Sequence, residues 1–489
     1  MDLPGASPTP DKTVAVVGGG LSGCLFALKM ARARPDFRVV VIERERRLGR
    51  GVAYGACSPE HMLNVPVSRM EVGLTPRFGD WLATHPAAGL ALAAALSESG
   101  GDLAAAFAPR ALFGEYLEAR VADALVIGPG RGLASVRGEA VKLLAGPRRG
   151  LMLADGREIA ADIVVLATGN MAPGSPSGPD AWFYDSAAFI PDPWAAGAFE
   201  GLAPGDPVLL LGSGLTMVDV ALRLDADGHR GPMLAVSRRG LAPKVHAAGG
   251  TWPSFLEEIL PASPRRLTRL VRDQVAQANA RGVPWQRVFD AARPAIPAAW
   301  RGWSLAEKRQ FLRHLRTRWD VHRHRMAPRI AAALSALLET KRLEILAARV
   351  RGYRPAAVGV EVVLTQRGGP RRTFVAARVI NCTGPRRDLA RLGTPLLADL
   401  RDRGLALPDQ LGLGLETSNG ALLDSARRPS DRLYALGALT CPSWWEITAV
   451  PEISVQVDRL VAHIAQGGTP EHDAPDLTAE DFLDLGAGI

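Results

Sequence analysis

The chain has 489 residues, of which 47% are hydrophobic, with a formal net charge of +8 and a pI near 9.7. This length allows about three domain-sized units, and no apolar run approaches the roughly 18 residues of a membrane span, which excludes an integral membrane protein. The Pro-rich start lacks the basic region and apolar core of a secretory signal, so we expect a cytoplasmic protein. Because arginine is spread along the whole chain, the positive charge does not by itself indicate a nucleic-acid partner.

The first predicted unit is a strand, a glycine turn and a helix. Apolar residues 14–17 lead into Gly18, Gly20 and Gly23, which have the spacing G-x-G-x-x-G. In such a turn the first glycine permits the tight bend, the second lets backbone approach a pyrophosphate, and the third lets the helix pack on the strand. The next strand ends at Glu43, about twenty residues past the last glycine, where a carboxylate accepts the hydroxyls of an adenosine ribose. These features predict a dinucleotide site.

Further candidate contacts to the same nucleotide follow in this first unit. The glycine-bearing loop around Arg50 is compatible with a second phosphate contact, and Asn64 lies in a segment expected near the reactive ring. A buried strand then ends in Thr168 and Gly169. We assign all four residues to cofactor binding, and Asn64 is also a candidate for holding a polar edge of the substrate.

A second fingerprint begins with the apolar strand 208–211, followed by Gly212 and Gly214. Met217 replaces its third glycine, so the helix must pack slightly farther from the strand. The next strand ends in Arg238 and Arg239, where an NAD site typically carries an acid. A guanidinium suits a 2′-phosphate, which favours NADPH over NADH. The alternatives are two solvent-facing arginines or use of both nucleotides.

The two units close in the same way, which is the nearest feature to an internal repeat. Each has a Gly-containing hairpin turn, at 155–156 and at 368–370, followed by a strand that ends in Thr-Gly. A chain with both fingerprints usually carries FAD and a nicotinamide nucleotide. We therefore predict an α/β fold of two Rossmann-like dinucleotide-binding domains, the second inserted into the first. The predicted ranges are 12–172 and 385–466 for the FAD domain, 205–384 for the NAD(P)H domain, and about 251–342 for a helical insertion within it.

The Arg-rich insertion begins one of its helices with a capping box at Ser304 and Glu307. Trp319, His322 and Met326 recur at helical spacing, which predicts one shared face. We consider His322 as a residue that orients or deprotonates the substrate, against the commoner alternative of a hydrogen-bonded core histidine. No carboxylate cluster accompanies the histidines, so no metal site is expected.

A late turn at Gly437, which we also assign to cofactor binding, precedes the last predicted helix, which begins near Glu452. The positive end of that helix would face the first nucleotide and stabilise negative charge on a reduced flavin ring. Trp444 and Glu446 lie in between and are candidate catalytic residues, with core packing as the alternative for the tryptophan.

Four cysteines, at positions 24, 57, 382 and 441, have neither C-x-x-C nor metal-ligand spacing. A zinc site or a disulfide framework is therefore not expected. The absence of a closely spaced pair also weighs against the disulfide reductases, which need a redox-active dithiol beside the flavin.

Taken together, several motifs resemble the bacterial FAD/NAD(P)-binding proteins that include FAD-dependent urate hydroxylase and a flavin-dependent aspartate N-monooxygenase. The motifs are Gly49-Arg-Gly-Val-Ala-Tyr54, Leu63-Asn-Val-Pro66, Leu166-Ala-Thr-Gly-Asn170, Phe311-Leu-Arg-His-Leu315, Trp319-Asp-Val-His-Arg-His-Arg-Met326 and Trp445-Glu-Ile-Thr-Ala-Val-Pro-Glu452. The resemblance extends over nearly the whole chain.

This resemblance implies a flavoprotein monooxygenase. NAD(P)H would reduce FAD, molecular oxygen would form a flavin hydroperoxide, and one oxygen atom would pass to a small anionic substrate. Urate, converted to 5-hydroxyisourate, is the first expectation. The alternatives are an amino-acid N-monooxygenase and a flavin-dependent NAD(P)H dehydrogenase or reductase that inserts no oxygen. The oligomeric state is not indicated.

Overall fold

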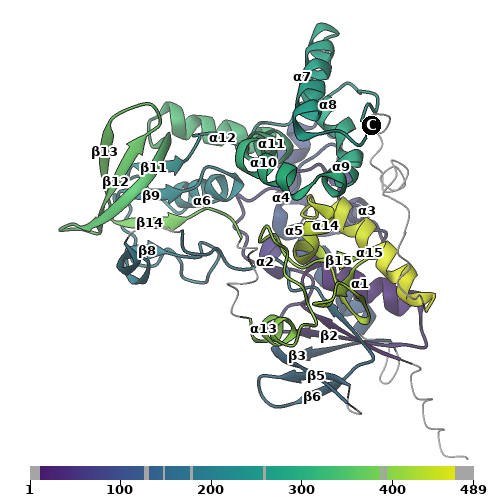
Figure 1. Cartoon of the computed structure of the whole chain (residues 1–489). Helices are drawn as coiled ribbons and strands as arrows, with labels where there is room; N and C mark the ends of the chain where they lie inside the picture. The colour runs from purple at the N-terminus through teal and green to yellow at the C-terminus, as the bar shows by residue number, and fades with distance from the viewer. Residues whose placement is uncertain are drawn as a thin grey trace, which may run out of the picture.

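The computed structural model describes residues 12–467 apart from 87, 126–131, 147–148, 177–179, 257–259, 386–387 and 389–393. The Pro-rich start of the chain lies outside the described residues. Within them, two seven-stranded sheets lie in separate parts of the molecule, and a group of helices lies above them in Figure 1. In this described part of the chain, none of the helices has both the length and the apolar character needed to cross a membrane.

The first sheet combines strands from both ends of the described chain. Its strands are β1 (Thr13–Val17), β2 (Arg38–Glu43), β3 (Gly132–Arg137), β7 (Ile163–Leu166), β15 (Thr417–Ser418), β16 (Ala421–Leu423) and β17 (Pro429–Ala435). The order is β15-β16-β17-β7-β1-β2-β3, and the neighbours from β17 to β3 are parallel. Val14 and Val16 enter one core, and Ala15 and Val17 enter another, because successive side chains of a strand point to opposite faces. Both faces of this sheet are therefore buried, as in other parallel sheets.

The second sheet is built from the middle of the chain. Its strands are β8 (Phe189–Ile190), β9 (Val208–Leu211), β10 (Met233–Ser237), β11 (Leu343–Pro355), β12 (Val360–Gln366), β13 (Arg371–Ala376) and β14 (Arg378–Asn381). The order is β13-β12-β11-β10-β9-β14-β8, with parallel neighbours from β11 to β8 and antiparallel neighbours from β11 to β13. All seven strands lie between β7 and β15 in the sequence. The predicted fold class, with a second unit inserted into the first, is confirmed.

Both predicted hairpins are present. A small antiparallel sheet holds β4 (Ala140–Leu144), β5 (Gly150–Leu153) and β6 (Glu158–Ala160), and the Asp155-Gly156 turn joins β5 to β6. In the second unit, the turn after β12 joins it to β13. Each hairpin leads directly into the strand that ends in Thr-Gly.

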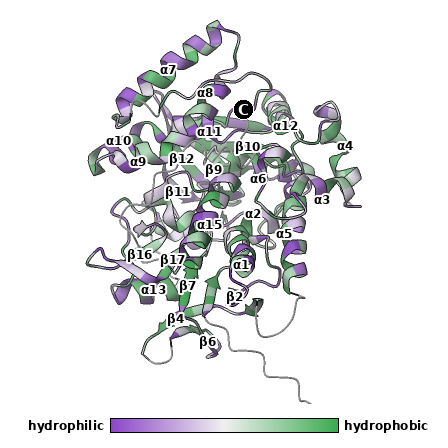
Figure 2. Ribbon diagram, turned by 90° about the vertical axis from the view of Figure 1, so that its right-hand side faces the viewer, coloured by the Kyte–Doolittle hydropathy of each residue, from purple (hydrophilic) through white to green (hydrophobic). Residues whose placement is uncertain are grey.

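Helices cover both faces of the two sheets. Those of the first unit are α1 (Leu21–Ala33), α2 (Gly51–Gly55), η1 (Val67–Arg69), α3 (Phe78–Thr84), α4 (Ala88–Glu98), α5 (Arg110–Leu125), α13 (Pro395–Asp402), η6 (Gly437–Thr440), α14 (Cys441–Trp444) and α15 (Val450–Ala465). Those that accompany the second sheet are η2 (Ala181–Asp185), α6 (Leu215–Ala226) and α12 (Pro328–Glu339). Figure 2 shows that the apolar residues gather in the strands and on the helix faces that cover them.

The helical insertion bridges the two units. It contains α7 (Pro264–Ala280), α8 (Trp285–Ala292), η4 (Arg293–Ala295), α9 (Ile296–Gly302), α10 (Leu305–His314) and α11 (Arg316–Arg323). The ring of Trp300 on α9 stacks on Trp445 with centroids 4.5 Å apart, and Phe311 on α10 joins the same core as the first sheet. Helix α12, also inside the predicted range 251–342, packs instead in the core of the second sheet. The insertion is therefore attached to the second unit by the chain and to the first unit by packing.

One sequence interpretation of this insertion is wrong and another is confirmed. The predicted capping box is present, since Ser304 accepts from the N–H of Glu307 and the Glu307 carboxylate accepts from that of Ser304. The expected common face of Trp319, His322 and Met326 does not exist, because α11 ends at Arg323 and Met326 forms a β-bridge with Val245. The end of α11 lies between His322 and Met326, and the sequence does not mark it.

Candidate functional site

The first glycine turn has the geometry that the fingerprint predicts. Gly18 has φ +107°, and a Cβ there would lie 2.3 Å from the carbonyl oxygen of Ala167. A Cβ on Gly23 would lie 1.9 Å from the oxygen of Gly18, so only glycine lets α1 approach the turn. Gly20 differs, because its Cβ position has nothing nearer than Gly51 Cα at 3.4 Å. The backbone at Gly20 is thus open to a ligand, as a pyrophosphate site requires.

The second turn repeats the first at its first two glycines. Gly212 has φ +111°, and a Cβ there would lie 2.4 Å from the carbonyl oxygen of Cys382. A Cβ on Gly214, which precedes α6, would meet no atom within 4 Å. Met217 is fully buried in the core of the second sheet, which fills the space that a third glycine would leave.

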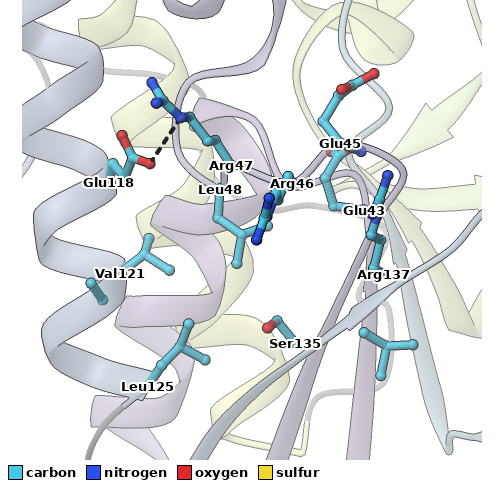
Figure 3. Close-up of a pocket in the computed structure, with 12 residues that line it drawn as sticks. Glu43, Glu45, Arg46, Arg47, Leu48, Glu118, Val121, Leu125, Ser135 and Arg137 are labelled. Atoms are coloured by element: carbon cyan, nitrogen blue, oxygen red, sulfur yellow. Dashed lines mark hydrogen bonds and ion pairs between the residues drawn. The ribbon is translucent and has the colours of Figure 1, made fainter.

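Glu43 lies in a cavity of about 310 Å³ at the ends of β2 and β3. Its carboxylate accepts from the backbone N–H groups of Gly19 (2.6 Å) and Glu45 (3.0 Å). Figure 3 shows Glu43 beside Arg46 and Arg137, with Arg47 directed to Glu118. The position fits an adenosine ribose bound next to the first glycine turn.

A larger cavity of about 710 Å³ lies where the two units and the insertion meet. Its lining includes Asn64 and Thr168 of the first unit, the start of α6 at Leu215, and the start of α15 at Val450. The Oγ1 of Thr168 is buried and has no hydrogen-bond partner among the described residues. An orphaned hydroxyl at the end of β7, in line with the glycine turn, fits the flavin portion of FAD.

The two units also contact each other directly at this cavity. Arg110 Nη1 on α5 donates to Asp219 Oδ2 on α6 at 2.9 Å, and both residues line the cavity. His61 Nε2 lies 3.2 Å from the backbone oxygen of Asp219. This pair ties the helix of the second glycine turn to the first unit.

Arg238 and Arg239 lie directly after β10. Arg238 is exposed, whereas Arg239 is half-buried: its Nη2 donates to the backbone oxygen of Arg313 (3.0 Å), and its Nη1 is buried without a partner among the described residues. Burial, followed by the like charges of Arg318 and Arg238, lowers the pKa of Arg239. This unbalanced positive charge fits a phosphate better than a purely structural role.

Glu446 belongs to a buried ion-pair network between the insertion and α15. Arg323 donates to Glu446 Oε2 (2.7 Å) and Glu452 Oε1 (3.0 Å), while Trp319 donates to Glu446 Oε1. Arg293 forms two 2.5 Å hydrogen bonds to Glu452. Burial raises the pKa of Glu452, but Arg293 and Arg323 outweigh it and lower the pKa to about 2. Two guanidinium groups thus pair with two carboxylates, and Glu446 is held by Arg323 and Trp319.

The remaining candidate residues divide between the cavity and the packed core. Asn64 lines the cavity, and its backbone oxygen lies 2.8 Å from His246 Nε2. The described lining residues do not include His322 or Trp444. The ring of His322 stacks on Phe289, and its Nδ1 lies 2.7 Å from the Arg318 oxygen. These contacts suit the core-histidine alternative, and a substrate role for either residue stays a prediction.

Three other predicted cofactor residues have well-defined surroundings. Arg50 Nε donates to Glu118 Oε2 (2.7 Å) on α5. The N–H of Gly437 donates to Gln456 (2.8 Å), and a Cβ there would lie 2.9 Å from the Ser22 hydroxyl. Gly169 has φ +68° and open space around its Cβ position. Their contact with FAD stays a prediction.

Several cavity residues were not identified from the sequence. Arg69, Arg325 and His246 line it, and Asp290 lies behind the two arginines. Arg69 follows the Leu63–Pro66 motif closely, and Arg325 lies inside the Trp319–Met326 motif, so the sequence offered a signal for both. His246 and Asp290 join them only through the fold. The described residues contain no group of three or more metal-ligating side chains.

Residues 15–171 match a family model described as FAD-NAD(P)-binding. A curated relative, L-aspartate N-monooxygenase (nitrosuccinate-forming) from Streptomyces cremeus, is 36% identical over 208 residues. That match covers 41% of this chain and 29% of the relative, so less than a third of the relative's length is spanned.

Solved structures share the fold over almost the whole chain. Ornithine hydroxylase from Pseudomonas aeruginosa gives a TM-score of 0.60 at 15% identity, covering 93% of this chain and 99% of that one. L-lysine 6-monooxygenase from Pseudomonas syringae gives 0.57 at 16% identity, with the same two coverages. A cadaverine monooxygenase from Erwinia amylovora, bound to FAD, gives 0.61 at 12% identity, covering 96% and 98%. These likenesses confirm the two-dinucleotide fold, and the family match supports FAD and NAD(P)H as its cofactors.

Proposed function

We propose that this chain, whose residues 15–171 match a family model described as FAD-NAD(P)-binding, is an FAD- and NAD(P)H-dependent N-monooxygenase that hydroxylates the amine of a small amino acid. The balanced reaction is R–NH₂ + O₂ + NAD(P)H + H⁺ → R–NHOH + NAD(P)⁺ + H₂O. The observation that carries the proposal is the shared cavity, because Thr168, the start of α6 and the insertion all reach it. One chamber can therefore bring flavin, nicotinamide and substrate together.

The comparisons favour this reaction over the first expectation from the sequence. The relatives reported above are named for aspartate, ornithine, lysine and cadaverine, each of which carries a primary amine. Urate hydroxylation gains no support from them, and the amino-acid N-monooxygenase alternative is the better-supported interpretation. A dehydrogenase or reductase without oxygen insertion is the second candidate, because the same two nucleotide sites would serve it.

When bound, FAD supplies the redox chemistry, taking two electrons from NAD(P)H and passing them to oxygen. In this proposal the backbone at Gly20 approaches the FAD pyrophosphate, and Glu43 holds the adenosine ribose. The backbone at Gly214 approaches the phosphates of the nicotinamide nucleotide, and Arg239 binds its 2′-phosphate. The Arg110–Asp219 pair holds α6 against the first unit, which limits the distance between the two nucleotides. The cavity walls exclude water from the reacting groups.

The test is NADPH oxidation by the FAD-loaded full chain with aspartate, ornithine, lysine, cadaverine and urate as separate substrates. The proposal expects one amine to accelerate NADPH oxidation and to yield a product heavier by one oxygen. Acceleration by urate alone would overturn it. NADPH oxidation that transfers electrons to a quinone and gives no oxygenated product from any amine would favour the reductase.

A further inference from the structure

Six arginines line the central cavity, and two aspartates are the carboxylate residues among its described lining. The arginines are Arg44, Arg69, Arg110, Arg293, Arg323 and Arg325. Three of them are neutralised by pairs already described: Arg110 by Asp219, and Arg293 and Arg323 by Glu452 and Glu446. Arg69 and Arg325, which interact electrostatically with Arg323, have a different balance of charge.

Around Arg69 and Arg325 a single carboxylate serves three guanidinium groups. Asp290 on α8 pairs with Arg325, lies 3.3 Å from Arg287, and lies 3.9 Å from Arg69. The Asp290 side chain is 16% exposed and that of Arg325 is 3% exposed, so water screens these charges poorly. The group therefore carries an excess of two positive charges next to the cavity.

The excess charge has unsatisfied donors. The Nε atoms of Arg325 and Arg287 are buried and have no hydrogen-bond partner among the described residues. Arg69 reaches Asp290 only at 3.9 Å, which is beyond hydrogen-bond distance, and its side chain is 18% exposed. Burial lowers the pKa of Arg69, and burial lowers that of Arg325 to about 10, as expected where like charges gather. Burial also lowers the pKa of His246 to about 4, so this neighbour adds no charge at neutral pH.

We propose that Arg69 and Arg325 form an anion subsite that binds the carboxylates of a small amino dicarboxylate, of which L-aspartate is the simplest. This inference rests on the proposed N-monooxygenase function and names its substrate class. Arg325 already donates from Nη1 to the Gln286 oxygen (3.2 Å) and from Nη2 to Asp290, so it contributes its charge and its Nε. Arg69 is the guanidinium that can take a carboxylate in two-point geometry, and two carboxylates balance the two excess charges. A diamine or a basic amino acid would instead add positive charge to a site that already has too much.

The balanced equation starts from the neutral amine, because an ammonium nitrogen has no lone pair with which to form the N–O bond. A bound ammonium therefore first gives its proton to solvent, and this proton equals the H⁺ that the equation consumes.

Binding of succinate, which has both carboxylates and no amine, tests the subsite without turnover. Calorimetry on the FAD-loaded full chain should detect succinate and L-aspartate. Arg69→Ala should weaken both at least tenfold, and Arg69→Lys should restore part of the loss because it keeps the charge. Arg272→Ala is the matched control, since it removes one exposed arginine from α7 of the same insertion and should change neither affinity. FAD content and melting temperature report whether each variant is folded.

The outcomes separate this inference from the proposed function. Unchanged succinate affinity in a folded Arg69→Ala variant would overturn the subsite. N-hydroxylation of ornithine or lysine in preference to aspartate would overturn the dicarboxylate class and leave the N-monooxygenase function standing. Arg69-dependent succinate binding with no N-hydroxylation of any amine would support the subsite and remove the proposed function.

Discussion

The two glycine turns begin alike and then diverge. Gly18 and Gly212 have nearly equal φ angles of +107° and +111°, and each lies against the carbonyl oxygen just before a Thr-Gly pair. In both sheets the strand before the turn lies next to the strand that leads to the Thr-Gly pair. This closeness explains why a side chain at the first glycine would be strained in both turns.

The divergence comes at the third position and at the end of the next strand. Gly23 allows α1 to touch the first turn, whereas Met217 fills the same place in the second. The neighbouring strand ends in Glu43 in one unit and in Arg238 and Arg239 in the other. The fold thus depends on what the turns share, and we expect the choice of nucleotide to depend on the residues in which they differ.

The largest expected effect is the difference between substitutions at the third positions of the two turns, Gly23 and Met217. Gly23→Val should abolish folded, flavin-containing protein, because even a Cβ would lie 1.9 Å from the Gly18 oxygen. Met217→Ala should cost about 2–5 kcal/mol by leaving a cavity in the core while the chain still binds FAD. Yield, flavin absorbance and melting temperature measure both. A yellow, stable Gly23→Val protein would contradict the geometry.

The contact between the units depends on pH through Glu452, whose pKa is lowered to about 2. Because the folded-state pKa lies below the unfolded value of about 4.3, the stabilisation is present above that value and is lost as pH falls toward 2. Glu452→Gln should cost about 3–5 kcal/mol at neutral pH, since it leaves buried arginines unpaired. It should also flatten the loss of melting temperature below pH 4.3. An unchanged acid profile would contradict this assignment.

The strand after the second glycine turn is followed by two arginines where the first unit has Glu43, which predicts a preference for NADPH over NADH. Replacing Arg238 and Arg239 by Ala should weaken NADPH binding by about 1.5–3 kcal/mol for each charged hydrogen bond lost, and should spare NADH. Titration of the FAD-loaded protein with each nucleotide provides the measurement. Equal losses for NADPH and NADH would mean that the arginines support the fold instead.

The smallest expected effect is the difference between substitutions at Thr168 and Thr383, the threonines of the two Thr-Gly pairs. Thr168 Oγ1 has no partner among the described residues, whereas Thr383 Oγ1 donates to Asn381 at 2.7 Å. Thr168→Val should weaken FAD binding by about 0.5–1.5 kcal/mol with little change in apoprotein stability, and Thr383→Val should do the reverse. FAD titration measures the affinity of each variant, and thermal melts of the apoproteins measure their stability. Equal behaviour of the pair would remove Thr168 from the flavin site.

The sequence predicted the parts of the molecule that local rules determine. The glycine turns, both hairpins and the Ser304 cap depend on residues within a few positions of one another, and all are present. The end of α11 at Arg323 has no such local marker, so the face assigned to Met326 was wrong.

The candidate site was predicted only in part, because its charges are placed by contacts far apart in the sequence. Arg69 meets Asp290 across more than two hundred residues, and no short motif announces the pair. The sequence also does not distinguish the roles of the neighbouring Trp444 and Trp445. Trp445, not Trp444, stacks on Trp300, since the chain takes φ +52° at Trp445 and turns that ring inward.

The most direct test of the central claim is turnover of L-aspartate by the FAD-loaded chain with NADPH under ¹⁸O₂. If the two nucleotide sites and the arginine-lined cavity act together, mass spectrometry should find one ¹⁸O atom bonded to the product nitrogen and the other in water. NADPH should be consumed in proportion to that product. NADPH oxidation that leaves every amine substrate unlabelled, with all the oxygen recovered as hydrogen peroxide, would contradict the account.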